Sequence, residues 1–202
     1  MKMPGRLLVF EGMDGSGKSV LSEATANLLE EQGSPSQLIT FPGRIRGTLG
    51  HLVYRIHHDA NANGINRLSP SSLQTLHIAA HLDAIESLIL PALAQGEDVV
   101  LDRYWWSTWA YGIAAGASRS IIEALVHVER VAWGPQRPAC IFYVQREDPD
   151  CQWSEDQQNL KVAYEEIMAN EAGNYPIQRI KNENTIEVAL EQVMSFVEPT
   201  LR

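Results

Sequence analysis

Residues near the start of the chain have the types and spacing of a phosphate-binding loop. Gly12 is followed, after four residues, by Gly17-Lys18-Ser19, which matches the pattern G-x-x-x-x-G-K-[ST]. Glycines let backbone N–H groups converge on a phosphate without an obstructing Cβ. Lys18 can reach the outer phosphates of a nucleotide, and the Ser19 hydroxyl suits Mg²⁺. The pattern predicts a nucleotide-phosphate and Mg²⁺ site, to which we also assign the neighbouring residues Gly15, Ser16 and Val20.

Charged residues also follow two later apolar stretches. One stretch leads into Phe41-Pro42-Gly43-Arg44, with Arg46 close behind, and the other leads into Asp102-Arg103-Tyr104. A carboxylate after an apolar strand is suited to hold Mg²⁺, directly or through water, and arginines clamp phosphates bidentately. The alternatives are solvated loop charges for the arginines and a buried ion pair for Asp102 and Arg103. Beside a phosphate loop, the functional interpretation is favoured.

The elements that must position these residues alternate along the chain. Apolar runs predict five strands, and segments of helical periodicity separate them. This alternation predicts an α/β fold of the P-loop NTPase type, a five-stranded, mostly parallel sheet with helices on both faces, in a single domain over residues 1–202. We expect strands at 7–10, 37–41, 98–102, 139–144 and 175–180, and helices at 18–31, 49–58, 70–95, 105–115, 120–133, 156–169 and 185–197. Ligands of such sheets bind at the carboxyl ends of the strands, where the charged residues fall.

Composition limits the possible partners. The net charge of −9 argues against a surface for duplex nucleic acid but is compatible with a small phosphorylated ligand. No apolar run approaches the roughly 20 residues of a membrane span, and the first strand begins too early for a signal peptide. Cys140 and Cys151 do not make a disulfide framework, and Cys140 is expected to be buried. We therefore expect a cytoplasmic protein without a membrane partner.

Three stretches resemble the thymidylate kinases, P-loop enzymes that phosphorylate deoxythymidine monophosphate with ATP. They are EGMDGSGKS, FPGR and VVLDRYWWSTWAYG, and the resemblance is specific over Leu7 to Gly112 and collinear afterwards (PACIFYV, YPIQRI). It implies ATP and Mg²⁺ as cofactors, a nucleotide substrate and a homodimer.

The resemblance also implies roles for single residues. Asp14 would lie near the acceptor sugar, and Asp102 and Arg103 would organise the metal and the phosphates. The catalytic set is then Lys18, Asp14, Arg103 and Arg44, and the metal ligands are Ser19 and Asp102. ATP would contact the loop (Gly12, Gly15, Ser16, Gly17, Lys18, Ser19, Val20) and, at its adenine, Asn182. The acceptor would contact Phe41, Pro42, Arg44, His81, Arg103, Tyr104, Thr108 and Tyr111.

Two departures from the family pattern concern the base pocket and the lid. The family has a Phe, and four residues later an Arg, on the long helix that lines the thymine pocket, and we align these positions with Ile78 and Leu82. This loss argues against thymine as the acceptor base. The family also has an arginine-rich lid, whereas the short lid region 145–164 has only Arg146 and Lys161 as cations. Phosphate charge would then fall to the cleft residues or to another cation (Arg6, Arg137 or a second subunit).

The remaining aromatic and imidazole residues allow more than one interpretation. His77 and His81 share one helix face and could be a metal pair, base contacts or partly buried scaffold, and no third metal ligand is evident. Tryptophans 105, 106 and 109 are expected in the core, with room for one of them to face the cleft.

The first function hypothesis is a nucleoside monophosphate kinase. The alternatives are a kinase acting on a nucleoside hydroxyl or on a modified pyrimidine in DNA, and a nucleotide-binding protein with little turnover.

Overall fold

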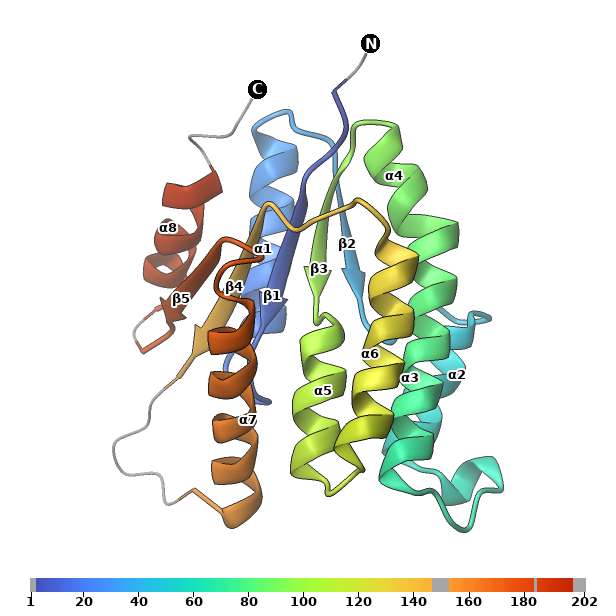
Figure 1. The fold of residues 1–202 in the computed structure, drawn as a ribbon. Helices are drawn as coiled ribbons and strands as arrows, with labels where there is room; N and C mark the ends of the chain where they lie inside the picture. Colours follow the sequence, from blue (N-terminus) through green and yellow to red (C-terminus); the bar gives the residue numbers. More distant parts are fainter. Residues whose placement is uncertain (1–2, 147–152, 184, 198–202) are drawn as a thin grey trace.

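Five parallel strands form the centre of the computed structural model, which describes residues 3–146, 153–183 and 185–197. The strand order is β2-β3-β1-β4-β5, and every neighbouring pair is parallel. This confirms the predicted α/β fold. The strands are β1 (Leu7–Glu11), β2 (Ser36–Thr40), β3 (Asp98–Asp102), β4 (Cys140–Gln145) and β5 (Ile177–Lys181). The helices, which cover both faces of the sheet (Figure 1), are α1 (Lys18–Glu31), α2 (Leu49–His58), α3 (Pro70–Ala84), α4 (Leu90–Ala94), α5 (Trp105–Ala114), α6 (Arg119–Trp133), α7 (Glu155–Glu171) and α8 (Ile186–Val197).

Alternate residues of each central strand pack into two different hydrophobic cores. In β1, Leu7 and Val9 lie in the core that α5, α6 and α7 complete, whereas Leu8 and Phe10 lie in the core that α1 and α8 complete. Successive strand residues point to opposite faces, so a strand covered on both sides is apolar throughout. Cys140 is buried in the second core as a free thiol, as predicted, and Cys151 lies outside the described residues.

Capping side chains begin several helices. The Ser69 side chain accepts a hydrogen bond from the Ser72 N–H, and Pro70 occupies the first helical position of α3. Ser154 and Gln157 form a reciprocal capping box at the start of α7. Such local signals explain why the predicted boundaries of most elements differ from the observed ones by only one or two residues.

The long helix predicted at 70–95 is not one regular α-helix. Between α3 and α4, residues Ile85–Ile89 form a π-helical turn, and Pro91 follows in the first turn of α4. Proline lacks an N–H and crowds the carbonyl of the preceding turn, so the backbone widens there. By length and composition alone, Pro70–Ala94 is the one helical stretch among the described residues that could cross a membrane. Ile85, Ile89 and Leu93 are each 2% exposed or less, as in a core helix.

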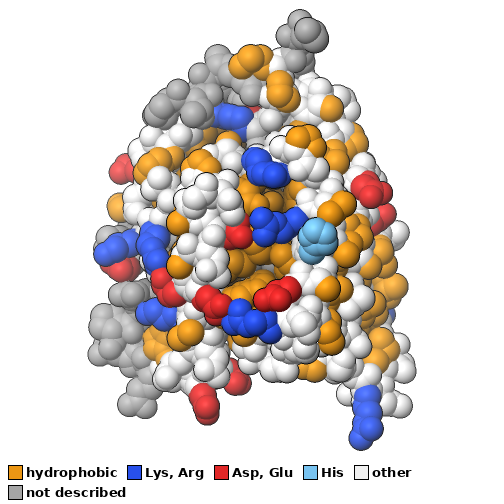
Figure 2. Space-filling view, in the orientation of Figure 1, with side chains coloured by type: hydrophobic (Ala, Val, Ile, Leu, Met, Phe, Trp, Pro, Cys, Tyr) orange, Lys and Arg blue, Asp and Glu red, His pale blue; other side chains and the backbone are white. Residues whose placement is uncertain are grey.

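The register of the sheet brings three strand ends together. Asp102 of β3 lies opposite Phe10 of β1 and opposite Thr40 of β2. Immediately beyond, the Arg103 N–H donates to the Phe10 carbonyl at 2.9 Å, and the Phe41 N–H donates to the Asp102 carbonyl at 2.9 Å. The segments that follow β1, β2 and β3 therefore start from adjacent points at one edge of the sheet. In the space-filling view, the surface is hollowed and basic, acidic and histidine side chains surround the hollow (Figure 2).

Candidate active site

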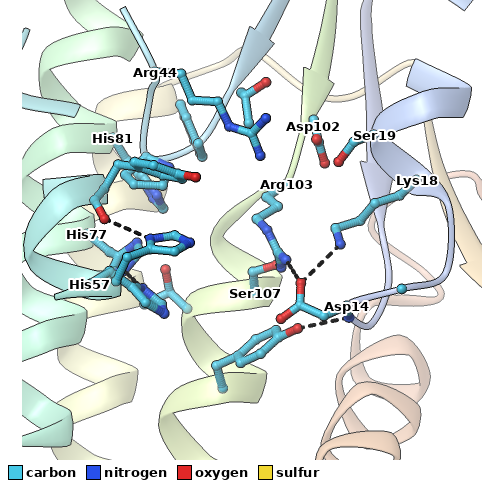
Figure 3. A pocket seen from close by; sticks show the side chains of 18 of the residues that line it. Asp14, Lys18, Ser19, Arg44, His57, His77, His81, Asp102, Arg103 and Ser107 are labelled. Atoms are coloured by element: carbon cyan, nitrogen blue, oxygen red, sulfur yellow. Dashed lines mark hydrogen bonds and ion pairs between the residues drawn. The ribbon is translucent and has the colours of Figure 1, made fainter. Parts of the chain in front are cut away.

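A cleft of about 380 Å³ opens at these strand ends. The phosphate loop and the start of α1 form one wall, and residues of α2 and α3 form the other, with Arg103 between them (Figure 3). Its lining includes most of the predicted site: Asp14, Gly15, Gly17, Lys18, Ser19, Val20, Phe41, Pro42, Arg44, His81, Asp102, Arg103, Thr108 and Tyr111. The topology thus brings together residues that are up to 97 positions apart in the chain, such as Asp14 and Tyr111.

The phosphate loop is shaped to receive an anion. Gly15 and Gly17 have φ values of 80° and 88°, in the left-handed region that favours glycine. Gly17 is the N-cap of α1, and no side chain caps this helix end. The N-terminus of a helix left open in this way attracts negative charge through its N–H groups and its dipole. Lys18 is 4% exposed, and its Nζ donates to the Met13 carbonyl at 3.3 Å. Burial, aided by the nearby Arg103, lowers the pKa of Lys18.

Asp102 and Ser19 fit the predicted magnesium site. Asp102 is 2% exposed, and its Oδ1 atom is buried without a hydrogen-bond partner. Figure 3 shows this carboxylate beside the Ser19 side chain. A buried oxygen without a partner is costly, and a hard cation would satisfy it. Within the described residues no group of three or more His, Cys, Asp or Glu could hold a metal by itself. The donor set therefore suits an ion that takes its remaining ligands from phosphate and water.

Arg103 connects the two walls of the cleft. It is a non-glycine residue with a φ of 77°, in the left-handed region, a conformation that is concentrated at functional sites. Its guanidinium forms an ion pair with Asp14 and donates to the Ser107 hydroxyl at 3.0 Å. It also lies 5.2 Å from the centre of the Tyr111 ring. Burial raises the pKa of Asp14, but the charges of Arg103 and Lys18 outweigh burial and leave this pKa below its usual value.

The opposite wall, which we call the ring-lined wall, contains several aromatic and imidazole rings, among them those of Phe41, Tyr54 and His81. Phe41 is 2% exposed and stacks on His81 with ring centres 3.9 Å apart. The exposed Arg44 lies over the ring of Tyr54, 5.4 Å from its centre, and Figure 3 shows Arg44 directed toward Arg103 and Asp102. Arg46 does not line the cleft. The segments that follow β2 and β3 thus contribute one arginine each to the described cleft, Arg44 and Arg103.

A different pair of residues on the long helix lies at the cleft from the pair that we aligned with the family's Phe and Arg. His77 and His81 line the cleft, whereas Ile78 is 3% exposed and neither Ile78 nor Leu82 contributes to the lining. Residues four apart lie on one helix face, so the pair that occupies the expected Phe and Arg spacing is His77 and His81.

Two imidazoles that line the cleft, His57 and His77, contact each other. His57 Nδ1 and His77 Nε2 are 2.7 Å apart, which requires one of the two nitrogens to be protonated and the other not. Burial, together with the neighbouring His81 and His57, lowers the pKa of His77 to about 2. Burial and His58 likewise lower the pKa of His57. Both shifts favour the uncharged form of the ring.

Several predicted site residues are not in this cleft. The Tyr104 side chain is 1% exposed and packs against Trp105, Trp133 and Tyr175, so the predicted substrate contact is corrected to a core position. Asn182 braces the phosphate loop, because its Nδ2 donates to the Ser16 carbonyl at 2.8 Å. Gly12 approaches β4 closely, because a Cβ at this position would lie 2.4 Å from the Val144 carbonyl oxygen. The tryptophans of α5 are all in the core, and none lines the cleft.

The predicted lid region 145–164 divides into different parts. Residues 147–152 lie outside the described part of the chain. The end of the region belongs to the core, because Tyr164 is fully buried in α7 and its hydroxyl donates to Glu11 Oε2 at 2.9 Å. Arg146 and Lys161 line a second cavity of about 260 Å³ on the other side of the loop, which Ser16 also lines. The two cations of the region thus lie next to the phosphate loop.

Sequence reasoning missed a buried carboxylate at the end of β1 that binds the start of α5. Glu11 is fully buried, and its carboxylate accepts hydrogen bonds from the N–H groups of Tyr104 and Ser107 at 2.7 and 2.9 Å. The hydroxyls of Ser107 and Tyr164 also donate to it, at 2.8 and 2.9 Å. Burial raises the pKa of Glu11, although Arg103 opposes this effect. The only signal in the sequence was a carboxylate at the end of an apolar strand.

Known proteins resemble this chain in sequence and in fold. A family model described as thymidylate kinase matches residues 10–192. A thymidylate kinase of Dinoroseobacter shibae is 40% identical over 126 residues, which are 62% of this chain and 57% of that protein, so the chain spans little more than half of that relative. A thymidylate kinase of Roseiflexus is 28% identical over 96% of this chain and 94% of its own length. The crystal structure of thymidylate kinase from Ehrlichia chaffeensis superimposes with a TM-score of 0.77 at 22% identity, covering 96% of this chain and all of the other.

Proposed function

Because the chain belongs to the thymidylate kinase family, we propose that it transfers the γ-phosphoryl group of ATP to a phosphate oxygen of a nucleoside monophosphate. The observation that carries the proposal is the arrangement of one cleft. Lys18 and the open end of α1 form one wall. Arg44 and the ring-lined wall lie opposite, and Arg103 lies between the two walls. Two anions bound at these walls would meet at Arg103.

Each cleft residue then has a role in positioning and charge neutralisation, which is what phosphoryl transfer requires. Lys18 and the loop N–H groups hold the ATP phosphates, and Arg44 holds the acceptor phosphate. Arg103 contacts the group in transfer, and Asp14 keeps Arg103 and Lys18 at one point until the phosphates arrive. Asp102 and Ser19 would hold Mg²⁺, which supplies charge neutralisation at the phosphate oxygens when it is bound.

The remaining predictions extend this proposal. Asn182 would approach the adenine while it braces the loop. The enzyme would act in the cytoplasm as a homodimer, and its net charge of −9 argues against duplex nucleic acid as a partner. Arg146 and Lys161 would add charge from the second cavity when ATP is bound.

The test is an acceptor panel with Mg-ATP. ADP release is measured with nucleoside monophosphates, with free nucleosides and with short oligonucleotides. The proposal expects turnover with at least one monophosphate and none with the other two classes. Turnover confined to nucleosides or oligonucleotides would instead identify a hydroxyl kinase, and ATP binding without any acceptor-dependent turnover would identify a nucleotide-binding protein.

A pair of variants tests whether Lys18 in this cleft is needed for the proposed reaction. Lys18→Ala is expected to lower kcat by about 10²–10³-fold or more, since it removes a charge aimed at the transferred group. Lys181→Ala removes an exposed lysine of β5 and should leave kcat within about twofold. Equal rates for Lys18→Ala and the unmodified chain would overturn the proposed function.

A further inference from the structure

A buried histidine–carboxylate pair connects the ring-lined wall of the cleft to α6. His81 Nδ1 lies 2.8 Å from Glu129 Oε2, and the two side chains are 3% and 0% exposed. The other oxygen, Glu129 Oε1, accepts a hydrogen bond from Trp133 Nε1 at 3.2 Å. Glu129 itself is not part of the cleft lining. Of these two partners of Glu129, His81 lines the cleft and Trp133 does not.

Within the described part of the chain, the contacts of His81 leave one ring nitrogen for a ligand. Phe41 stacks on the ring with the planes 12° apart, which fixes its orientation. A carboxylate only accepts hydrogen bonds, so Nδ1 carries the proton that is shared with Glu129. In neutral imidazole the other nitrogen, Nε2, then has a lone pair and accepts. His81 lines the cleft, and Nε2 is the ring nitrogen that Glu129 does not contact.

We propose that His81 Nε2 accepts a hydrogen bond from an exocyclic amino group of the acceptor base, and that Glu129 is the positioning residue that sets this polarity. The proposal rests on the proposed function. His81 stands at the helix position where the resemblance implies an arginine, which has only donors and reads a base carbonyl. An acceptor in the same place suits an amino group, so the pocket selects a cytosine-type base over a thymine-type base.

Glu129→Gln tests the proposal by inverting the polarity. Trp133 Nε1 is a donor only, so the carbonyl oxygen of the new amide must turn toward it. The amide NH₂ group then faces His81 and donates to Nδ1. The imidazole proton moves to Nε2, which becomes a donor toward the cleft. The variant keeps the size and the hydrogen bonds of the buried site while it reverses what the acceptor base meets.

The experiment measures kcat/KM for dCMP and for dUMP. At position 4 of the base, dCMP has an amino group and dUMP has a carbonyl oxygen, and both lack the 5-methyl group of thymine. The full chain should favour dCMP, and Glu129→Gln should shift the dCMP-to-dUMP ratio toward dUMP by about tenfold or more. The KM for ATP should stay within about twofold, because the ATP wall is untouched. Glu171→Gln is the matched control, a 6% exposed carboxylate on α7 that accepts from Asn174 and lies outside the cleft, and it should leave the ratio unchanged.

A second readout separates this inference from the proposed function. Nitrogen-15 NMR of labelled histidine should report an Nδ1-protonated His81 in the natural chain and an Nε2-protonated His81 in Glu129→Gln. If no monophosphate is turned over, the proposed function fails, and the affinities for dCMP and dUMP measured by calorimetry still decide the base preference. A preference of the natural chain for dUMP would overturn the inference. An unchanged ratio in Glu129→Gln would also overturn it, as would an Nε2–H or doubly protonated His81 in the natural chain.

Discussion

Asp14 of the phosphate loop and Arg103 after β3 form an ion pair across the cleft, and Lys18 Nζ lies 3.5 Å from the same carboxylate. The carboxylate thus lies between the two cations that the transferred phosphoryl group would need. It holds them together in the protein without nucleotide, where they would otherwise repel each other.

Replacing Asp14 by Asn should show this role as a small, pH-dependent loss of stability. The pKa of Asp14 is lowered, so the carboxylate stabilises the fold above its ordinary pKa of 3.8, and the contribution is lost as the pH falls through the lower folded value. The side chain is 73% exposed, so the loss at pH 7 should be below about 1 kcal/mol. Urea unfolding at pH 7 and at pH 2.5 measures it. An equal loss at both pH values would contradict the ion-pair explanation.

Arg44→Ala should raise the KM for the acceptor without changing the KM for ATP. Arg44 lines the cleft beside the ring-lined wall, and loss of a bidentate phosphate contact should lower kcat/KM by about 10²–10³-fold. Arg46→Ala is the matched control, since Arg46 is exposed two residues later and does not line the cleft. Steady-state kinetics with each substrate varied in turn distinguishes the two variants. A comparable defect in both would assign the effect to general charge instead of to a specific contact.

His77→Phe should make the protein more resistant to acid. The pKa of His77 is lowered from 6.5 to about 2, so its protonation opposes folding increasingly as the pH falls below 6.5. At pH 4.5, two units lower, the penalty is about 2–3 kcal/mol, and Phe does not incur it. The measurement is the difference in unfolding free energy between variant and natural chain, at pH 4.5 and at pH 8. The exposed His127 of α6, replaced by Gln, is the control, and it should show no such gain.

Glu11→Ala should destabilise the fold by about 3 kcal/mol, because it leaves the buried N–H groups of Tyr104 and Ser107 without a partner. Glu11→Gln retains an oxygen for these donors and should cost less. Denaturant unfolding at pH 7 compares the two variants. If Glu11→Gln were as damaging as Glu11→Ala, the carboxylate charge and not the hydrogen bonds would be the stabilising feature.

The fold and the phosphate site could be derived from the sequence because their signals are local. The loop Gly12–Ser19 needs its glycines and Lys18 at fixed spacing, and the strands are continuous apolar runs because both faces are covered. Strand ends in a parallel sheet share one edge, so the sequence alone assigns Asp102 and Arg44 to the same cleft. A side chain's direction within an apolar segment has no such local signal, which is why Tyr104 was wrongly assigned to the substrate.

Tertiary structure alone decided which residues of α3 line the cleft. Which pair on α3 faces the cleft depends on the rotation of the helix against the sheet, and packing placed His77 and His81 there instead of Ile78 and Leu82. The partner of His81 comes from a residue 48 positions later, on a helix whose own sequence shows only an amphipathic surface. Contacts between distant segments depend on how whole helices dock, and that is determined by the packing of the complete core.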